Sequence, residues 1–312
     1  MTLFFGYHMP NYTFPELPPE RLFDRTVELA CAAESAGFDL VTVMDHFHQI
    51  GPVGPETEPM LEAYTALGAL AARTDRVLLG AMVTGVTYRN PAMVAKQVAT
   101  LDVISQGRAV LGLGAAWNES EHRAYGWDLP PIGERMDRLG EALEICRRML
   151  RSDEPATFEG QHYAVHGALN VPHPLRPGAP PVLIGGGGEQ RTLRFVARYA
   201  DIWNVFGPLD ELRRKNELLD RYATEADRDP GSIRRTVMVP LVLAADLAAG
   251  QRILERVVPE RRSSTIVATP QRAQDVLGEY REAGFDGFIL RNVNLPSPEA
   301  IGLAGEVIRA LR

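Results

Sequence analysis

The sequence predicts an α/β fold, and specifically a TIM (β/α)8 barrel. Short apolar runs alternate with longer amphipathic runs along all 312 residues, which is typical of βα units that build a parallel sheet. This alternation gives about eight strands and at least as many helices, the number that closes a barrel. The tetrapeptide Ala-Gly-Phe-Asp also joins a helix to an apolar strand twice, at 36–39 and at 283–286, which favours repeated units, although such sequences are also common in loops between a helix and a strand.

In the first half of the chain, each element follows from its local pattern. The first helix has an apolar face and stops at Gly37. Asn90 caps the third helix, and Pro91 suits the first helical position because the N–H group it lacks would have no partner there. Strands are expected at 3–8, 38–44, 77–83 and 109–113. Helices are expected at 21–36, 60–73, 90–105 and 134–151.

The second half repeats the alternation after an irregular insertion at about 152–180, which contains a hairpin-like stretch at 157–163. Strands are expected at 181–185, 201–206, 236–243 and 287–291, and helices at 189–199, 209–226, 247–257, 270–283 and 298–311. We therefore expect one domain, 1–312, with an insertion after the fourth helix. A doubly wound open sheet is the main alternative, but 7–11 lacks the Gly-rich turn that a dinucleotide-binding sheet carries after its first strand.

Composition narrows the possible partners. The net charge of −7, from 33 basic and 40 acidic side chains, gives no electrostatic footprint for nucleic acid or for an anionic membrane. The sequence shows no signal-peptide pattern and no window of about 18 uninterrupted apolar residues. We therefore expect a cytoplasmic protein that acts on a small-molecule substrate and binds neither nucleic acid nor membrane.

Functional groups of barrel enzymes gather at the C-terminal ends of the strands. The second predicted strand ends in Asp45-His46-Phe47-His48, which can position a ring cofactor and exchange a proton near neutral pH. A metal site at the His-x-His element is an alternative, although no third ligand is evident, and a purely structural loop is another. We predict that Asp45 and His46 contact a cofactor, that His46 is catalytic, and that no metal is bound.

Two further strand ends are candidates. The fourth strand ends in Gly114, Ala115, Ala116, Trp117 and Asn118. Small residues there let a ligand lie against the backbone and the indole can form a pocket wall, but crowding inside a barrel explains the small residues equally well. The third strand ends at 82–84, where the residues alone indicate only a strand that runs into a loop.

The fifth predicted strand ends in four consecutive glycines, Gly185, Gly186, Gly187 and Gly188, which precede a predicted helix. Their N–H groups and the helix dipole can bind a phosphate, although Gly-rich turns also occur for conformational reasons alone. The pattern is neither a Walker nor a Rossmann loop. The chain also lacks a nucleophile elbow and a glycosidase-like carboxylate pair. Together these features favour a phosphate-bearing ring cofactor that carries redox chemistry.

Four stretches of the chain, in order, resemble the luciferase-like monooxygenase and F420-dependent oxidoreductase superfamily. They are 45–47, 76–80 with 88–92, 101–108 with 112–117, and 185–188 with 199–203, and together they span most of the chain. The resemblance implies a barrel with a flavin-type ring at the C-terminal ends of its strands, cofactor contacts at Asp45, at His46 and at 114–118, phosphate contacts at 185–188, and a homodimer. It also implies a non-proline cis peptide at Met82–Val83 or one residue later, so we count Met82, Val83 and Thr84 as cofactor-binding residues.

The resemblance also bears on the cofactor. Asp-His-Phe at 45–47 is similar to the F420 branch, whereas FMN-dependent members more often carry Glu-His-His, so we expect coenzyme F420 with FMN as the alternative. The F420-dependent sugar-phosphate dehydrogenases of the superfamily place a glutamate acid just after the fourth strand, and this chain has Trp117 instead. This departure argues against the same sugar dehydrogenation. It leaves the proton donor open, with His46 favoured over Glu119 and Glu121.

Three functions therefore stay open. The first is hydride transfer between F420 and an unidentified organic substrate, and the second is an FMN-dependent monooxygenase that uses reduced flavin and O2. Oxygen consumption with reduced FMN separates these two, because a 5-deazaflavin does not support that chemistry efficiently. The third is a non-catalytic flavin-binding or structural relative. We expect the loops at 49–59, 117–133 and 259–270 to shape the substrate site, because they are the least patterned parts of the chain.

Overall fold

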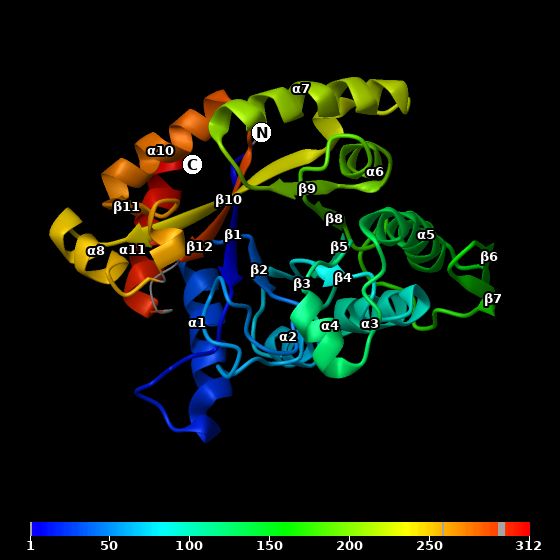
Figure 1. The fold of residues 1–312 in the computed structure, drawn as a ribbon, viewed down its shortest axis with the longest axis horizontal. Helices are drawn as coiled ribbons and strands as arrows, with labels where there is room; N and C mark the ends of the chain where they lie inside the picture. The colour runs from blue at the N-terminus through cyan, green and yellow to red at the C-terminus, as the bar shows by residue number, and fades with distance from the viewer. Residues whose placement is uncertain (1, 258, 293–296) are drawn as a thin grey trace.

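The computed structural model describes residues 2–257, 259–292 and 297–312. Eight parallel strands close into a barrel, because the last of them pairs with the first (Figure 1). In order around the barrel they are β1 (Phe4–Met9), β2 (Leu40–Val43), β3 (Leu78–Ala81), β5 (Ala109–Gly114), β8 (Val182–Gly185), β9 (Ile202–Val205), β10 (Arg234–Leu243) and β12 (Gly287–Asn292). The predicted (β/α)8 barrel is confirmed, and the open-sheet alternative is wrong.

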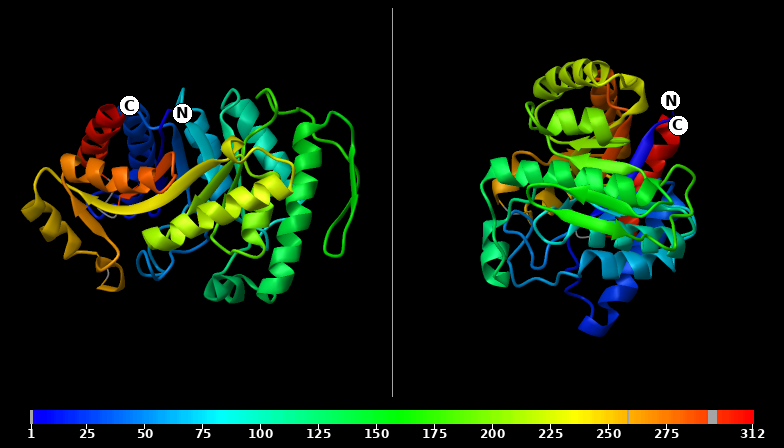
Figure 2. Two further views of the ribbon diagram at one scale, coloured as in Figure 1. Left: turned by 90° about the horizontal axis from the view of Figure 1, so that it is seen from above. Right: turned by 90° about the vertical axis from the view of Figure 1, so that its right-hand side faces the viewer.

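Helices lie outside the strands, as the two turned views in Figure 2 show. The long ones are α1 (Leu22–Ala36), α2 (Ala63–Ala71), α3 (Pro91–Ile104), α5 (Ile132–Arg151), α6 (Thr192–Tyr199), α7 (Leu209–Glu225), α8 (Leu247–Leu254), α10 (Pro270–Glu282) and α11 (Pro298–Leu311). The amide N–H of Ala92 donates to the Asn90 side chain at 2.9 Å, which confirms the predicted cap of α3. Within the described ranges, no helix combines the length and the apolar character that crossing a membrane requires.

The predicted insertion is present as a two-stranded antiparallel hairpin that follows α5. It consists of β6 (Ala156–Glu159) and β7 (Ala164–Ala168), and it projects beside α5 at the edge of the molecule (Figure 1). The carboxylate of Glu141 on α5 accepts hydrogen bonds from the N–H groups of Gln161, His162 and Tyr163, which fixes the turn of the hairpin to the helix.

Several predicted ends differ from the observed ones by one to three residues, and two expected loops contain regular elements. Helix α6 begins at Thr192 rather than at 189, because residues 189–191 form a turn. The stretch at 117–133 contains a short helix, α4 (Glu119–Tyr125). Its only buried residues are Glu121 and His122, so the sequence shows no apolar stripe that would predict a helix there. The stretch at 259–270 contains α9 (Pro259–Arg262) and β11 (Ile266–Ala268), which pairs with β10.

The strands divide the core into two layers. One apolar cluster fills the inside of the barrel, and the larger one lies between the strands and the helices. The inner cluster consists of Phe4, Leu40, Met82, Val110, Leu183, Ile202 and Ile289. Alternate residues of each strand point to opposite sides. Therefore His8, at an even number of residues from Phe4 on β1, also faces the inside.

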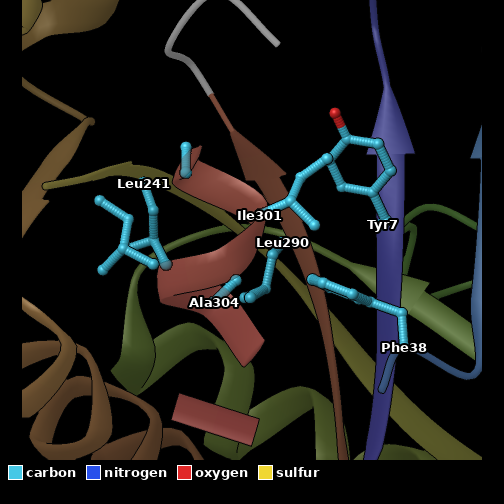
Figure 3. A pocket seen from close by; sticks show the side chains of 8 residues that line it. Tyr7, Phe38, Leu241, Leu290, Ile301 and Ala304 are labelled. Atoms are coloured by element: carbon cyan, nitrogen blue, oxygen red, sulfur yellow. The ribbon is translucent and has the colours of Figure 1, made fainter. Parts of the chain in front are cut away.

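A small apolar cavity lies in the outer layer, between α11 and the strands β1, β10 and β12 (Figure 3). Tyr7, Phe38, Leu241, Leu290 and Ile301 are among its lining residues. Its volume of about 10 Å³ is at most enough for one water molecule, so it is a packing gap and not a binding site.

Candidate active site

The candidate active site lies at one end of the barrel. Because β2, β3, β5 and β8 are consecutive parallel neighbours, their carboxyl ends meet there. The short strand β4 (Thr84–Gly85) continues from β3 and aligns Gly85 with Gly114 of β5. The segments that follow these strands carry the Asp-His pair, the turn at 114–118 and the tetraglycine at 185–188. We call this end the barrel mouth, and the predicted convergence of the three segments on it is confirmed.

Val83 forms an apolar floor of the barrel mouth. The bond between Met82 and Val83 is a cis peptide, as the resemblance predicted. The half-buried Val83 side chain lies so close to β5 and β8 that a Cβ atom on Gly114 would be 2.6 Å from Val83 Cγ2, and one on Gly185 would be 3.1 Å from Cγ1. Glycine at both positions therefore leaves room for Val83. Met82 packs into the inner apolar cluster beside it, and Thr84 is fully buried.

Asp45 is buried in a chain of ion pairs. Its Oδ2 accepts hydrogen bonds from Arg89 Nη1 at 2.7 Å and from the Gly85 N–H at 3.2 Å. Arg89 Nη2 donates to Glu62 Oε1 at 2.6 Å, and the guanidinium lies 5.1 Å from the ring centre of Tyr64. Burial alone would lower the pKa of Arg89, but Asp45 and Glu62 raise it above its usual value. These contacts fix the segment after β2 to the segment after β4.

His46 lies at the mouth and is held by Glu121. Its Nδ1 is 2.8 Å from Glu121 Oε2, and its ring is edge-on to Trp117 with 5.7 Å between ring centres. The fully buried Glu121 carboxylate also accepts hydrogen bonds from the Phe47 N–H and, at 2.6 Å, from the Tyr88 hydroxyl. Burial alone would raise the pKa of Glu121, but the hydrogen bonds from His46, Phe47 and Tyr88 lower it to about 2. Glu121 is therefore an anion that has no proton to donate near neutral pH.

Helix α4 is fixed beside the mouth by an aromatic cluster. The His122 ring stacks on Tyr88 with 4.9 Å between ring centres, and its Nε2 is 2.7 Å from the Thr87 hydroxyl. The Trp127 ring packs edge-on against Phe47 at 4.8 Å. These contacts join α4 to the segments after β2 and β4, so the helix and the His46 loop form one unit.

An arginine side chain fixes the conformation of the turn after β5. Arg135 of α5 donates hydrogen bonds to the carbonyl oxygens of Ala115 and Ala116, and Ala116 has a positive φ of 57°. The next side chain, Trp117, is 54% exposed, whereas Asn118 is buried. Arg135 therefore occupies the carbonyl oxygens of this turn, and the exposed indole of Trp117 is the group that the turn leaves accessible at the mouth.

The tetraglycine segment lies beside a cation. The Gly186 N–H donates to the Asn204 carbonyl at 3.0 Å, and the Trp203 indole N–H donates to the Gly186 carbonyl at 2.8 Å. A Cβ atom on Gly187 would lie 3.1 Å from Lys215 Nζ. Because α6 starts only at Thr192, the glycines do not lead directly into a helix N-terminus. The positive charge next to them is that of Lys215, which also lies 3.5 Å from Glu211 Oε2 on the same helix. No pattern in the sequence pointed to this lysine.

The sequence analysis also missed His8. Its Nδ1 is 2.9 Å from the Thr42 hydroxyl of the neighbouring strand. Burial and the proximity of His46 lower the pKa of His8 to about 4, so His8 is neutral near pH 7. Its inward position near the end of β1 was a usable signal, because the strand alternation places it on the same side as Phe4.

The alternative of a metal site receives no support from the part of the chain that the structure describes. No three histidine, cysteine, aspartate or glutamate side chains are grouped there in a way that could hold a metal ion. His48, the second histidine of the His-x-His element, directs its Nδ1 to the Gln49 carbonyl at 3.1 Å.

The closed barrel, with its apolar floor, paired histidine and glycine-rich segment at the strand ends, defines an α/β-barrel enzyme. The family model of luciferase-like monooxygenases matches residues 4–275, and the chain belongs to this family.

Known relatives agree with this assignment. An F420-dependent glucose-6-phosphate dehydrogenase from Intrasporangium calvum is 32% identical over 310 residues, covering 87% of this chain and 88% of that protein. Among solved structures, an F420-dependent secondary alcohol dehydrogenase in complex with an F420-acetone adduct has a TM-score of 0.84 at 23% identity, with both chains fully covered. A riboflavin lyase with modified FMN and riboflavin also has a TM-score of 0.84, at 18% identity, covering all of this chain and 92% of that one. At these identities the two structures show the shared fold.

Proposed function

We propose that this protein is an F420-dependent oxidoreductase that transfers a hydride between coenzyme F420 and an organic substrate. The F420 dependence of the relative from Intrasporangium calvum supports the choice of cofactor. The structural observation that supports the proposal most is that the pair of His46 and Glu121 and the apolar Val83 side chain both follow barrel strands at the same mouth. This arrangement offers a surface for a flat ring and a histidine for proton transfer within one barrel mouth.

The residues at the mouth fit a cofactor that has a ring and a phosphate. The half-buried Val83 offers apolar contact to a ring, and Lys215 beside Gly187 offers a positive charge to a phosphate. Met82 and Thr84 have buried side chains, so they would contribute through their backbone. When bound, the deazaflavin supplies the hydride chemistry. The proposed cofactor-binding residues are Asp45, His46, Met82, Val83, Thr84, Gly114, Ala115, Ala116, Trp117, Asn118, Gly185, Gly186, Gly187 and Gly188.

Calorimetric titration of the protein with F420 and with FMN, side by side, tests the cofactor. We expect F420 to bind more tightly, and equal or tighter FMN binding would overturn the proposal. The variant Lys215→Met should weaken F420 binding by about tenfold, because a charge-assisted hydrogen bond to a phosphate contributes about 1.5–3 kcal/mol and part of it is offset by the existing contact of Lys215 with Glu211. Arg213→Met on the same helix is the matched control, because Arg213 is half exposed and pairs only with Asp210 among the described residues.

His46 is the proposed catalytic residue, with the task of accepting or returning a proton at the mouth. His46→Ala should lower kcat by about 10²- to 10⁴-fold, the usual contribution of a positioned acid or base. The far-ultraviolet circular dichroism spectrum should match that of the wild type, and turnover should be compared at saturating F420, because His46 is also a proposed cofactor contact. His48→Ala, two positions along the same loop, should keep its turnover. Unchanged turnover of His46→Ala at saturating cofactor would contradict the role.

An FMN-dependent monooxygenase is the second candidate function. The family name and the fold shared with an FMN-containing riboflavin lyase favour it. Oxygenated product formed from a substrate panel in the presence of reduced FMN decides between the two. The F420 enzyme should form none above a control that lacks protein, because free reduced FMN consumes oxygen by itself. Binding of F420 without turnover of any substrate would instead support a non-catalytic relative.

The substrate remains an unidentified small molecule. The relative from Intrasporangium calvum is named for glucose-6-phosphate. In this chain Trp117 follows the fourth barrel strand, at the place where the family resemblance implies a glutamate for sugar-phosphate dehydrogenases. The exposed indole of Trp117 and the adjoining helix α4 are the proposed substrate-facing surface. Activity on glucose-6-phosphate comparable to that on the best substrate found in a panel would refute this distinction.

We also propose that the protein works in the cytoplasm as a homodimer. A shallow groove between α2 and α3 exposes Met93 by 56% and Ile104 by 45%, with Gly68 leaving room beside them. These two apolar side chains lie among polar lining residues such as Lys96 and Thr100, a mixture that suits the contact surface of two soluble subunits. Light scattering should give twice the chain mass of 34.4 kDa, and Met93→Asp should give the single mass. A wild-type monomer at micromolar concentration would contradict the dimer.

A further inference from the structure

We propose that Glu121 is a positioning residue that holds His46 in the tautomer with the proton on Nδ1, so that Nε2 presents its lone pair at the barrel mouth. The expected effect of Glu121 on turnover rests on the proposed function. The protonation of the His46 imidazole does not depend on that function, because it follows from the contacts within the protein.

The surroundings of Glu121 consist of hydrogen-bond donors. Its Oε2 faces His46 Nδ1 at 2.8 Å, the Tyr88 hydroxyl at 2.6 Å and Asn118 Nδ2 at 3.4 Å. Its Oε1 accepts from the N–H of Phe47 and, at 3.4 Å, from that of His48. The side chain has no exposed surface. A fully buried carboxylate is stable only when its lone pairs are satisfied in this way.

The tautomer of His46 follows from the charge of its partner. A carboxylate has only acceptor sites, so the atom that contacts it must carry the hydrogen, and that atom is Nδ1. A neutral imidazole has a single N–H, and therefore Nε2 of His46 has none. Among the described residues, Nε2 has no hydrogen-bond partner, and the side chain is 12% exposed. Nε2 is thus the atom that can exchange a proton with a bound molecule.

Glu121 stands apart from the other acids of its helix. Glu119, two residues earlier on α4, is 77% exposed and pairs with Arg123. Glu121 instead turns inward and connects three segments: α4 itself, the loop after β2 and Tyr88 of the segment after β4. The same contacts that orient the imidazole therefore also attach α4 to the barrel. Glu119 gives a matched control, because it is the same residue type on the same helix without these contacts.

The experiment that tests the proposal is nitrogen-15 NMR of histidine-labelled protein without cofactor, at about pH 8.5, well above the usual histidine pKa. His46→Ala identifies the signals of His46. We expect a protonated Nδ1 and a bare Nε2 in the wild type and in Glu119→Gln. Glu121→Gln should lose this preference, because an amide can also donate, and Glu121→Asp should restore it in part. A wild-type His46 with the proton on Nε2, or a Glu121→Gln spectrum like the wild type, would overturn the proposal.

Turnover gives the second readout. Glu121→Gln should lower kcat by about 10²-fold while F420 affinity changes by less than about threefold, and Glu121→Asp should recover part of the loss. Circular dichroism reports whether each variant folds. If a variant does not fold, the tautomer of His46 in the wild-type protein still tests the proposal. A protein with the stated tautomer that fails to bind F420 would refute the proposed function and leave this inference standing. Full kcat in a Glu121→Gln variant with a disturbed tautomer would contradict the positioning role.

Discussion

At the scale of single residues, the low pKa of Glu121 makes the stability of the folded protein depend on pH. The pKa is lowered from 4.5 to about 2 in the folded protein, so the unfolded chain binds the proton more readily. The resulting stabilisation is fully present above about pH 4.5 and is lost as the pH falls toward 2. We expect the free energy of unfolding in urea to fall more between about pH 6 and about pH 3 in the wild type than in Glu121→Gln.

The comparison of slopes isolates Glu121 from the other carboxylates, which titrate in both proteins. Glu119→Gln should follow the wild-type profile, since its side chain is mostly exposed. Parallel profiles for the wild type and Glu121→Gln would show that the buried carboxylate has no special linkage to acid unfolding.

Arg89 is the second residue with a large expected effect. It is the shared partner of Asp45 and Glu62, and Arg89→Met would leave the buried Asp45 without its cation. Removing one member of a buried ion pair costs about 3–5 kcal/mol of unfolding free energy. Arg123→Met removes an arginine that is 75% exposed and pairs with Glu119, and it should cost less than about 1 kcal/mol. Similar losses for both variants, measured by urea unfolding, would contradict the structural role of Arg89.

The sequence predicted where the candidate residues lie along the strands, but not which side chains they contact. Asp45 and His46 stand at the mouth because they end a strand, and the rule of strand ends finds such residues. The same rule does not predict the ion pair between Asp45 and Arg89, or the hydrogen bond between His46 and Glu121, which is 75 residues away in the sequence. Both contacts depend on side-chain geometry. Lys215 was invisible for the same reason, since it reaches Gly187 from a different βα unit.

At the scale of elements, the close approach of β3 and β5 depends on Gly112. A Cβ atom there would overlap the Ala81 carbonyl oxygen, which is backbone and cannot move aside cheaply. Gly112→Ala should therefore destabilise the protein by several kcal/mol or prevent folding. Gly302→Ala in α11 meets nothing within 4 Å and should instead stabilise the protein by about 0.5–1 kcal/mol. A thermally stable Gly112→Ala variant would contradict the geometry of these strands.

Elements with a strong hydrophobic period were predicted well, and elements built on polar contacts were not. The barrel strands and long helices occur where apolar spacing indicated them. Helix α4 was missed because its buried residues are a glutamate and a histidine, which carry no hydrophobic signal. The start of α6 was placed too early because the glycines were read as leading straight into the helix, whereas a turn separates them.

At the scale of the whole molecule, the barrel closes through the pairing of β1 with β12, which joins the two ends of the chain. Because every barrel strand needs both neighbours, we expect residues 1–312 to behave as a single domain with one cooperative unfolding transition. The calorimetric enthalpy should agree with the van't Hoff enthalpy that is calculated for unfolding coupled to dissociation of the proposed dimer. Two resolved transitions, or a transition of the hairpin β6–β7 at lower temperature, would contradict the single domain.

The architecture was predictable from the sequence because strands and amphipathic helices alternate along most of the chain. About eight such strand–helix units are the number that closes a barrel. The substrate was not predictable, because the stretches expected to shape its site carry no regular pattern. Two of them turned out to contain short elements, α4 in one and α9 with β11 in the other.

The three tryptophans of the chain occupy three different environments. Trp203 is fully buried, Trp127 packs in the aromatic cluster, and Trp117 projects from the rim with about half of its surface exposed. Intrinsic fluorescence therefore contains one solvent-facing emitter at the place where ligands are proposed to bind. Trp117→Phe would remove that component and leave the other two. The change in Trp117 fluorescence can therefore report ligand binding at the mouth without an added label.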